Sequence, residues 1–323
     1  METFIIAEAG ANHNKDFNQA LKLIDVAKEA GASAVKFQTY SSETLYSKNT
    51  PDFAGYKNIS QLIKDIELPR EWQKDLKQYC DEVGIEFMST PFDEQAVDEL
   101  VNLGVKRLKI AGFESTDWRF VDMVASTGLP LIISLGIGFK EEYLDIINDI
   151  TRDYNNDVTL LHCNNAYPTP ISDINLNTIP HLIKNTNYNV GLSDHTESTL
   201  TPSLAVAMGA TVIEKHYTLS KHFPGPDHPF AIEPHELKEM IDNIRLTETM
   251  LGGIKGEFSK SELDFAKARR SIVAKTPIKK GEILTLDNMT TKRPYLEGNI
   301  PASEWFNILG EKSTKSYKPD DFI

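Results

Sequence analysis

Two short polar stretches each follow an apolar run in the second half of the chain. They read GLSDHT (191–196) and EKHY (214–217). Alternate side chains of a β-strand share a face, so Ser193 is expected beside His195, and Glu214 beside His216. Two imidazoles from neighbouring strands suit one divalent metal, Mn²⁺ or Mg²⁺, whose other ligands are water and substrate oxygens. A hydrogen-bonded structural pair is the alternative, and no HExxH or cysteine pattern indicates zinc.

Lysines and hydroxyl groups end several of the other apolar runs. Lys36 and Lys109, together with serine, threonine and asparagine side chains, form the donor set that binds a phosphate and a carboxylate. No GxxxxGK[ST] loop indicates a nucleotide. The sequence therefore predicts a small phosphorylated acid as ligand, and the alternative is that the lysines only pair with acidic residues.

Carboxylates with apolar neighbours are the candidates for general acid–base chemistry. Glu8 and Glu114 each lie near the predicted end of a strand, where apolar flanks raise the pKa of a carboxyl group toward neutral pH. Glu214 competes for this role, and an ion pair with a lysine is the alternative for each. The PGP turn at 224–226 presents Asp227 and His228 to a sugar hydroxyl, unless it only closes a loop.

These residues need a fold that gathers the ends of many strands. Short β-branched runs alternate with amphipathic helical segments about eight times before residue 250, which is typical of parallel βαβ units. Eight such units predict an α/β fold of the (β/α)₈ TIM barrel type, whose active site lies at the C-terminal ends of the strands. The predicted strands are Thr3–Ala9, Ala34–Thr39, Glu86–Thr90, Arg107–Ala111, Leu129–Ser134, Thr159–Cys163, Asn189–Ser193 and Thr211–His216.

The predicted helices lie between these strands. Apolar residues at helical spacing follow Phe17, and Gly31 supplies the left-handed residue that ends that helix. Further helices are predicted over Asp93–Leu103 and Pro234–Met250, the second with proline in its first turn. The long polar connection from Thr39 to Pro69 shows no strand pattern, and we interpret it as a lid over the active site.

The composition changes after the barrel pattern ends. We predict a catalytic barrel over residues 1–251, a glycine-rich and charged linker over 252–269, and a small strand-poor domain over 270–323. Within the small domain, Ser271–Ala274 and Ile283–Thr285 are the predicted strands.

Charge and cysteine content restrict the partners and the compartment. The 323 residues carry a formal net charge of −13, which argues against binding to nucleic acid or to an anionic membrane. Cys80 and Cys163 both lie in apolar periodic segments, so a disulfide framework is not expected and a reducing cytoplasm is. No segment has the pattern of a signal peptide or a membrane span.

The ordered motifs of the chain resemble those of the sialic acid synthase family. In such enzymes a (β/α)₈ barrel is followed by an antifreeze-like (SAF) domain. The resemblance implies condensation of phosphoenolpyruvate with an N-acylated hexosamine, giving a nonulosonic acid and phosphate. The motifs that carry it are IIAEAGANHN, VKFQTY, FMSTPFD, LKIAGFE, LLHCNNAYPTP, VGLSDHT, IEKHYTL, PGPDH and RRSIVAKTPIKKGEILTLDNMTTKRP.

The resemblance also implies a role for individual residues. His195 and His216 would bind the metal, and Glu8 and Glu114 would be the catalytic carboxylates. Arg293 matches an arginine that reaches the active site of the partner subunit, which implies a domain-swapped homodimer. Phosphoenolpyruvate would be held by Lys36, Thr90, Lys109, Asn165 and Ser193, and the acceptor sugar by Gln38, Tyr167 and Asp227.

One motif departs from the family pattern, and one bears on the acceptor. The family often has KIGSGE where this chain has KIAGFE at 109–114, so a hydroxyl expected for phosphate is missing at Gly112. The PGPDH motif followed by an Ile–Glu–Pro segment is closer to the neuraminate and legionaminate branches than to the pseudaminate branch. The acceptor is then N-acetylmannosamine, its 6-phosphate or a diacetamido-trideoxyhexose.

Two other functions are compatible with parts of the sequence. An aldolase or lyase would use Lys36, Lys109 or Lys215 as a Schiff base with pyruvate, without metal or phosphate release. A non-catalytic sugar-binding or ice-binding protein would keep the small domain on a degenerate barrel. Both histidines, both lysines and Glu114 are present, which argues against the second alternative.

Overall fold

The chain forms two compact units. The structure, a computed structural model, describes residues 2–52, 57–154 and 156–323. The first unit spans Met1–Gly252 and the second Gly253–Ile323. The predicted linker over 252–269 includes a 3₁₀ helix, Lys260–Ala268, and its role as a linker stays a prediction.

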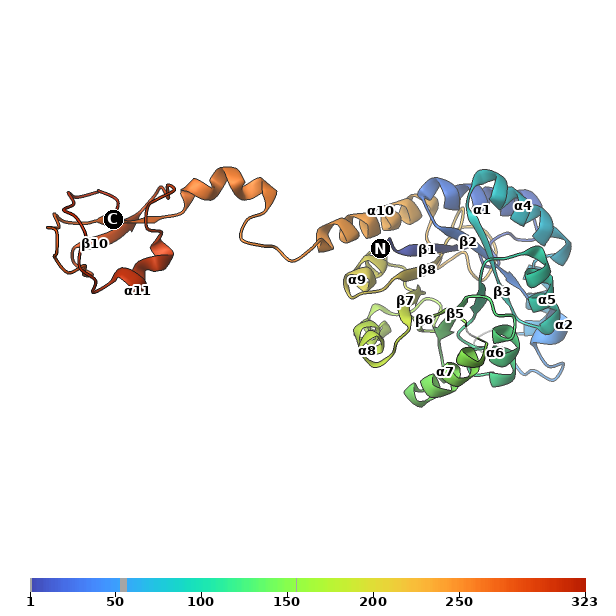
Figure 1. Ribbon diagram of the computed structural model, residues 1–323. Coiled ribbons are helices and arrows are strands. Elements are labelled where there is room, and N and C mark those ends of the chain that lie inside the picture. Colours follow the sequence, from blue (N-terminus) through green and yellow to red (C-terminus); the bar gives the residue numbers. More distant parts are fainter. Residues whose placement is uncertain (1, 53–56, 155) are drawn as a thin grey trace. The chain divides into compact units, whose positions relative to one another are not determined.

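Eight parallel strands form the barrel of the first unit (Figure 1). The hydrogen-bonded order runs β3-β2-β1-β8-β7-β6-β5-β4, and the two end strands, β3 and β4, pack against each other. The predicted TIM barrel is therefore confirmed, with most strand ends within one or two residues of the prediction. The strands are β1 (Phe4–Glu8), β2 (Ala34–Thr39), β3 (Glu86–Pro91), β4 (Leu108–Ile110), β5 (Leu131–Leu135), β6 (Val158–Cys163), β7 (Asn189–Asp194) and β8 (Val212–His216).

Helices surround the barrel. Three short 3₁₀ turns, Arg70–Trp72, Glu141–Tyr143 and Ile171–Asp173, lie in the connections. The helices are α1 (Phe17–Ala30), α2 (Ser42–Leu45), α3 (Ile59–Ile66), α4 (Gln73–Val83), α5 (Glu94–Leu103), α6 (Trp118–Ala125), α7 (Leu144–Asp153), α8 (Thr178–Asn185), α9 (Leu200–Ala207) and α10 (Pro234–Leu251). None of the described helices is long and apolar enough to cross a membrane.

Capping residues fix the ends of these helices. The carboxylate of Asp16 accepts hydrogen bonds from two backbone N–H groups at the start of α1, and Gly31 ends the helix at φ 93°. The predicted helix over Asp93–Leu103 begins one residue later, because Asp93 is its N-cap and accepts from the backbone N–H of Ala96. The predicted proline start of α10 is confirmed.

The connection between Thr39 and Pro69 contains helices α2 and α3, and its residues 53–56 lie outside the described part of the chain. Helix α2 is tied to the barrel, since Thr44 Oγ1 donates to Asp93 Oδ2 at 2.9 Å. The backbone N–H of Ser42 donates to Glu67 Oε2 at 2.9 Å. That the connection from Thr39 to Pro69 functions as a lid stays a prediction.

Inside the barrel, an apolar layer of side chains lies below a second layer that is mostly polar, which we call the polar layer. Six buried side chains fill the lower layer: Ile6, Ala34, Met88, Ile132, Leu161 and Val212. Two residues further along the same strands lie Glu8, Lys36, Thr90, Ser134, Cys163 and Glu214, which are also buried. Because side chains repeat with a period of two, this second set faces the interior near the C-terminal ends of the strands. The apolar layer closes the barrel below a polar site.

The second unit has a small core of its own. Strands β9 (Ser271–Ala274) and β10 (Met289–Lys292) pair antiparallel, and α11 (Trp305–Ile308) follows. The predicted strand Ile283–Thr285 is wrong: Ile283 is exposed and makes only an isolated bridge to Lys312. Strand β10 was not predicted, because its sequence MTTK has no apolar alternation. The core contains Ile272, Ala274, Ile278, Leu284, Met289, Tyr317 and Ile323.

Candidate active site

Lys36 is the centre of one half of the polar layer. Its Nζ lies 3.0 Å from Glu8 Oε2 and 3.6 Å from Glu214 Oε2, and it donates to Thr90 Oγ1 at 2.7 Å. Gln38, two residues further along β2, donates from Nε2 to Glu8 Oε1 at 2.7 Å. Strands β1, β2, β3 and β8 thus bring these five side chains to one place.

Lys109 is the centre of the other half. Its Nζ donates to Ser134 Oγ at 2.7 Å and lies 3.8 Å from Glu214 Oε1. Ser193 Oγ donates to Glu214 Oε1 at 3.2 Å. The sequence interpretation did not single out Ser134, although the period of two along β5 places it on the same face as the buried Ile132.

Burial and charge shift the pKa values of the three carboxyl groups differently. Burial raises the pKa of Glu8 to about 7 against the opposing charge of Lys36. Burial also raises the pKa of Glu114 to about 7, against the charge of Lys109. For Glu214 burial acts upward too, but Lys109 and Lys36 outweigh it and lower the pKa. Glu214 is therefore a charged partner of the lysines, whereas the other two exchange protons near neutral pH.

The two lysines differ as well. Burial favours the neutral form of Lys36, yet the charges of Glu214 and Glu8 outweigh it and raise its pKa. The pKa of Lys109 is lowered, because burial outweighs the charge of Glu214. The surroundings therefore favour the charged form of Lys36 and disfavour the charged form of Lys109.

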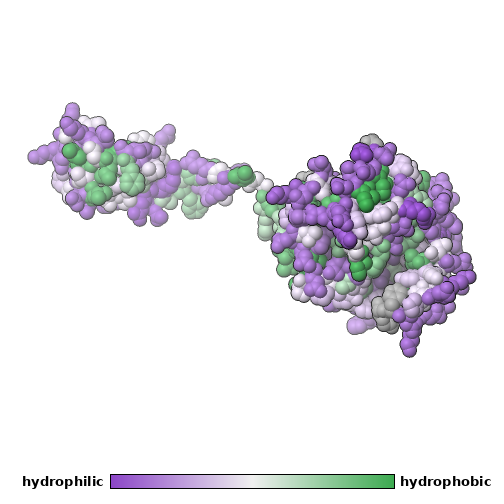
Figure 2. Space-filling model, turned by 90° about the horizontal axis from the view of Figure 1, so that it is seen from below, coloured by the Kyte–Doolittle hydropathy of each residue, from purple (hydrophilic) through white to green (hydrophobic). Residues whose placement is uncertain are grey.

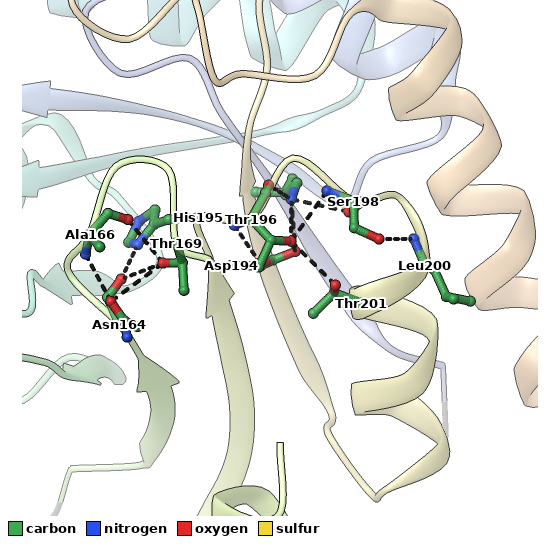
Figure 3. A network of polar contacts seen from close by, with 10 residues as sticks. Asn164, Ala166, Thr169, Asp194, His195, Thr196, Ser198, Leu200 and Thr201 are labelled. Atoms are coloured by element: carbon green, nitrogen blue, oxygen red, sulfur yellow. Dashed lines mark hydrogen bonds and ion pairs between the residues drawn. The ribbon is translucent and has the colours of Figure 1, made fainter. Parts of the chain in front are cut away.

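His195 and His216 lie next to each other at the ends of β7 and β8. Their ring centroids are 5.5 Å apart, and the Tyr167 ring lies 4.2 Å from His195 and 6.2 Å from His216. His195 Nδ1 lies 2.6 Å from the carbonyl oxygen of Asn164, so that nitrogen carries the hydrogen (Figure 3). His216 Nδ1 is buried and has no hydrogen-bond partner. Burial lowers the pKa of both rings, which leaves them neutral and able to bind a metal.

The remaining predicted barrel residues surround the histidines and the lysine layer. Asp227 Oδ2 lies 3.7 Å from His216 Nδ1 and accepts from the backbone N–H of Ala11 at 3.2 Å. Asn165 Nδ2 contacts the Tyr167 hydroxyl at 3.4 Å. The exception among the predicted site residues is Arg293, which is exposed in the second unit.

The departure at Gly112 has a steric explanation. A Cβ atom at this position would lie 2.8 Å from Asn165 Oδ1 and 3.1 Å from the Cα of Gly136. Asn165 Oδ1 is held in place by the backbone N–H of Ile137, which donates to it at 2.7 Å. The side chain of Asn165 therefore occupies the space that a serine at position 112 would need.

Lys215, considered above as a Schiff-base lysine, does not face the site. It lies between Glu214 and His216 on β8, so its side chain points to the opposite face of the strand. Its Nζ donates to Asp194 Oδ2 at 2.8 Å and to the carbonyl oxygen of Thr196. This lysine is a structural partner of the β7 end.

The motifs of the barrel and of the small unit match known families. The model of the NeuB family matches residues 23–256, and that of the SAF domain matches residues 269–323. The chain belongs to the NeuB family. The predicted sialic acid synthase resemblance and the predicted antifreeze-like domain are thereby confirmed.

Named relatives of this NeuB family member cover nearly the whole chain. It is 41% identical to the N,N'-diacetyllegionaminic acid synthase of Legionella pneumophila over 97% of this chain and 90% of the relative. It is 36% identical to a pseudaminic acid synthase of Campylobacter jejuni over 100% of this chain and 95% of the relative. The crystal structure of N-acetylneuraminic acid synthetase from Leptospira borgpetersenii superposes with a TM-score of 0.76 at 34% identity, covering 83% of this chain and 91% of that one.

Proposed function

We propose that this protein is an enzyme that condenses phosphoenolpyruvate with an N-acyl hexosamine, giving a nonulosonic acid and phosphate. The observation that carries the proposal is the buried polar layer, in which Lys36 and Lys109 both lie within 4 Å of Glu214. The two neutral histidines lie beside it, with ring centroids 5.5 Å apart. The names of the relatives support it, since they are synthases of such acids. A Schiff-base reaction is the alternative, and it would be detected by borohydride trapping with pyruvate.

Phosphoenolpyruvate would be bound by the polar layer. Lys36 and Lys109 supply positive charge in a buried site, where an anion is attracted more strongly than in water. The hydroxyl groups of Thr90 and Ser193 and the amide of Asn165 would supply further hydrogen bonds to it. We add Ser134 to this set, because its hydroxyl already contacts Lys109.

The two histidines fit a divalent metal, Mn²⁺ or Mg²⁺. Hydrogen bonding of His195 Nδ1 to a carbonyl leaves Nε2 with a free lone pair, and the neutral ring of His216 has a buried nitrogen without a partner. Within the described ranges no group of three or more His, Cys, Asp or Glu side chains is arranged for a metal, so water and substrate would complete the shell. When bound, the metal would polarise the aldehyde of the acceptor.

The carboxylates would handle the proton transfers. After C3 of phosphoenolpyruvate bonds to the aldehyde carbon, positive charge develops at C2 and water must add there. Glu8 or Glu114, with pKa values of about 7, would remove a proton from that water. Phosphate then leaves by C–O cleavage, and the two lysines stabilise its charge.

The acceptor would lie against Gln38, Tyr167 and Asp227. We propose the legionaminate or neuraminate branch, with a diacetamido-trideoxyhexose as the first candidate. The higher identity to the legionaminic acid synthase than to the pseudaminic acid synthase supports this order, as does the PGPDH motif.

A panel of acceptors tests both the reaction and the branch. Phosphate release is measured with phosphoenolpyruvate, Mn²⁺ and either N-acetylmannosamine, its 6-phosphate or a diacetamido-trideoxyhexose. One acceptor is expected to give a much higher kcat/KM, because a missing hydroxyl or acetamido group leaves buried polar partners unpaired. Absence of phosphate release with every acceptor would argue against a synthase.

Replacement of a histidine tests the metal site. The His216→Ala variant is expected to fold and to lose metal-dependent condensation, since one of two imidazoles is removed. Circular dichroism checks the fold, and phosphate release is followed with and without chelator. Full activity of the chelated variant would refute the assignment.

We further propose a homodimer of cytoplasmic location in which Arg293 completes the site of the partner subunit. The family resemblance supports the homodimer. Cys80 and Cys163, which are both free and buried, support a reducing compartment such as the cytoplasm.

A further inference from the structure

The buried ion pair of Lys215 and Asp194 lies directly behind His195, and none of the roles above uses it. The two residues are opposite each other on β8 and β7, and both are at most 1% exposed. Their neighbours Ser193, His195, Glu214 and His216 face the interior, so the pair lies on the outer face of the two strands that carry the histidines.

The ammonium of Lys215 holds the turn that follows β7. It donates to Asp194 Oδ2 at 2.8 Å, to the carbonyl oxygen of Thr196 and to that of Ser198 at 3.2 Å. Asp194 closes the same turn, because its Oδ1 accepts from the backbone N–H of Thr196 at 2.9 Å. The Thr196 hydroxyl also contacts Asp194 Oδ2 and Thr201 Oγ1, each at 3.2 Å (Figure 3).

The other side of His195 is held by the loop after β6. The carbonyl oxygen of His195 accepts from the backbone N–H of Thr169 at 2.9 Å, and its Nδ1 contacts the carbonyl oxygen of Asn164. The Thr169 hydroxyl closes this loop by donating to the carbonyl oxygen of Ala166 at 2.9 Å. Figure 3 shows His195 between the two networks. The loop after β6 holds the ring itself, whereas the Lys215 network holds the backbone that follows His195.

We propose that Lys215 and Asp194 are a positioning pair, which fixes the turn at 194–198 so that His195 presents Nε2 to the site. The carbonyl oxygen of Asn164 sets the tautomer of the His195 ring, and the pair acts on the backbone that places this ring against it. The pair touches neither substrate, so its removal should weaken metal binding and turnover without changing the KM for phosphoenolpyruvate. The turnover part of this inference rests on the proposed function, whereas the orientation of the ring does not.

The test uses the full chain with both charges removed, Lys215→Met with Asp194→Asn, because a single substitution would leave an unpaired buried charge. The control is Arg107→Met with Glu86→Gln, which removes a partly buried 2.7 Å ion pair at the opposite end of the barrel. Mn²⁺ affinity, kcat and KM are measured for each. We expect about a 10- to 100-fold loss in Mn²⁺ affinity and kcat in the first variant only.

A second readout needs neither metal nor turnover. In metal-free protein with ¹⁵N-labelled histidine, the His195 signals, assigned from His195→Ala, should show hydrogen on Nδ1 alone. In the double variant the two ring nitrogens should move toward averaged shifts. Wild-type shifts together with wild-type Mn²⁺ affinity would overturn the proposal. If wild-type protein releases no phosphate, the proposed function fails while the ring shifts still decide the positioning role.

If the double variant does not fold, Thr196→Val replaces it. This change removes the hydroxyl contacts of Thr196 to Asp194, Thr201, Lys215 and the backbone N–H of Ser198, and keeps the Lys215–Asp194 ion pair. Thr151→Val, which removes a buried hydroxyl bond within α7, is its control. A fall in Mn²⁺ affinity in Thr196→Val alone supports the proposal. Equal affinity in the two variants, with unchanged ring shifts, overturns it.

Discussion

Glu8, Glu114 and Glu214 each lie near the charge of a buried lysine. The pKa values of Glu8 and Glu114 are raised, whereas the pKa of Glu214 is lowered. Glu214 has both Lys36 and Lys109 within 4 Å and stays ionised. For Glu114, burial raises the pKa by more than the charge of Lys109 lowers it. One of its carboxylate oxygens is buried without a hydrogen-bond partner. The same residue type therefore serves as a fixed counter-charge in one place and as a proton carrier in the other.

The raised pKa of Glu114 makes stability depend on pH in a defined direction. Its pKa is about 7 in the folded chain against an ordinary value of 4.5, so the unfolded chain releases this proton first. The contribution is fully present below about pH 4.5 and is lost as pH rises through 7. Relative to Glu114→Gln, wild-type protein should lose on the order of 3 kcal/mol of unfolding free energy between pH 4.5 and 8.

Urea unfolding of both proteins at several pH values measures this difference. The same group should give a limb in the pH dependence of kcat/KM, with activity rising through an apparent pKa near 7 as the base ionises. Loss of that limb in Glu114→Gln would assign the base to Glu114, and its retention would assign it to Glu8, whose pKa is also about 7. Parallel stability curves for the two proteins would show that the carboxyl group titrates normally.

At the level of elements, the barrel could be predicted because its strands are fully buried and strongly apolar. β2 has the predicted bounds, and the residues two positions beyond the apolar layer, such as Lys36 and Glu214, fall where the site was expected. Strand β10 could not be predicted, since MTTK is stabilised by pairing with β9 and not by its own pattern.

Contacts between distant elements limited the prediction of the site. The sequence placed Lys215 among the candidate Schiff-base lysines, although the period of two sets it on the outer face of β8. Its partners on the β7 turn became visible only when the two strands were paired. The fit of Asn165 against Gly112 likewise depends on the approach of β4, β5 and β6.

The approach of β7 to β8 gives a prediction at this scale. A Cβ at Gly191 would lie 2.2 Å from the carbonyl oxygen of Val212 and 2.6 Å from Leu161 Cδ2. Gly191→Ala must therefore push the two strands apart, which moves His195 relative to His216. We expect about 1–3 kcal/mol of lost stability and a clear fall in Mn²⁺ affinity.

Thermal unfolding and Mn²⁺ titration measure these two effects. Gly253→Ala is the control, because no atom lies within 4 Å of a Cβ built there. Wild-type Mn²⁺ affinity in a Gly191→Ala protein would contradict a metal site formed by both strands.

At the level of the whole molecule, the barrel and the SAF unit have separate cores, and one predicted site residue lies outside the barrel. Arg293 is exposed and directly follows β10. An exposed arginine on a small separate unit is available to a second subunit, as the family resemblance implies. The proposal predicts that one active site contains residues of two chains.

Complementation between inactive subunits tests this arrangement. Glu8→Gln removes a carboxylate of the barrel, and Arg293→Ala removes the arginine of the other unit, so each homodimer should be inactive. When the two variants are produced together, about half of the dimers are mixed, and each mixed dimer has one site with both residues intact. Co-expressed protein, purified through different tags on the two subunits so that only mixed dimers remain, should then show about half the wild-type rate of phosphate release per dimer. Absence of recovery in dimers that are shown to be mixed would mean that Arg293 acts within its own chain, because each chain would then lack one of the two residues. Activity of the Arg293→Ala homodimer would mean that Arg293 takes no part in the site.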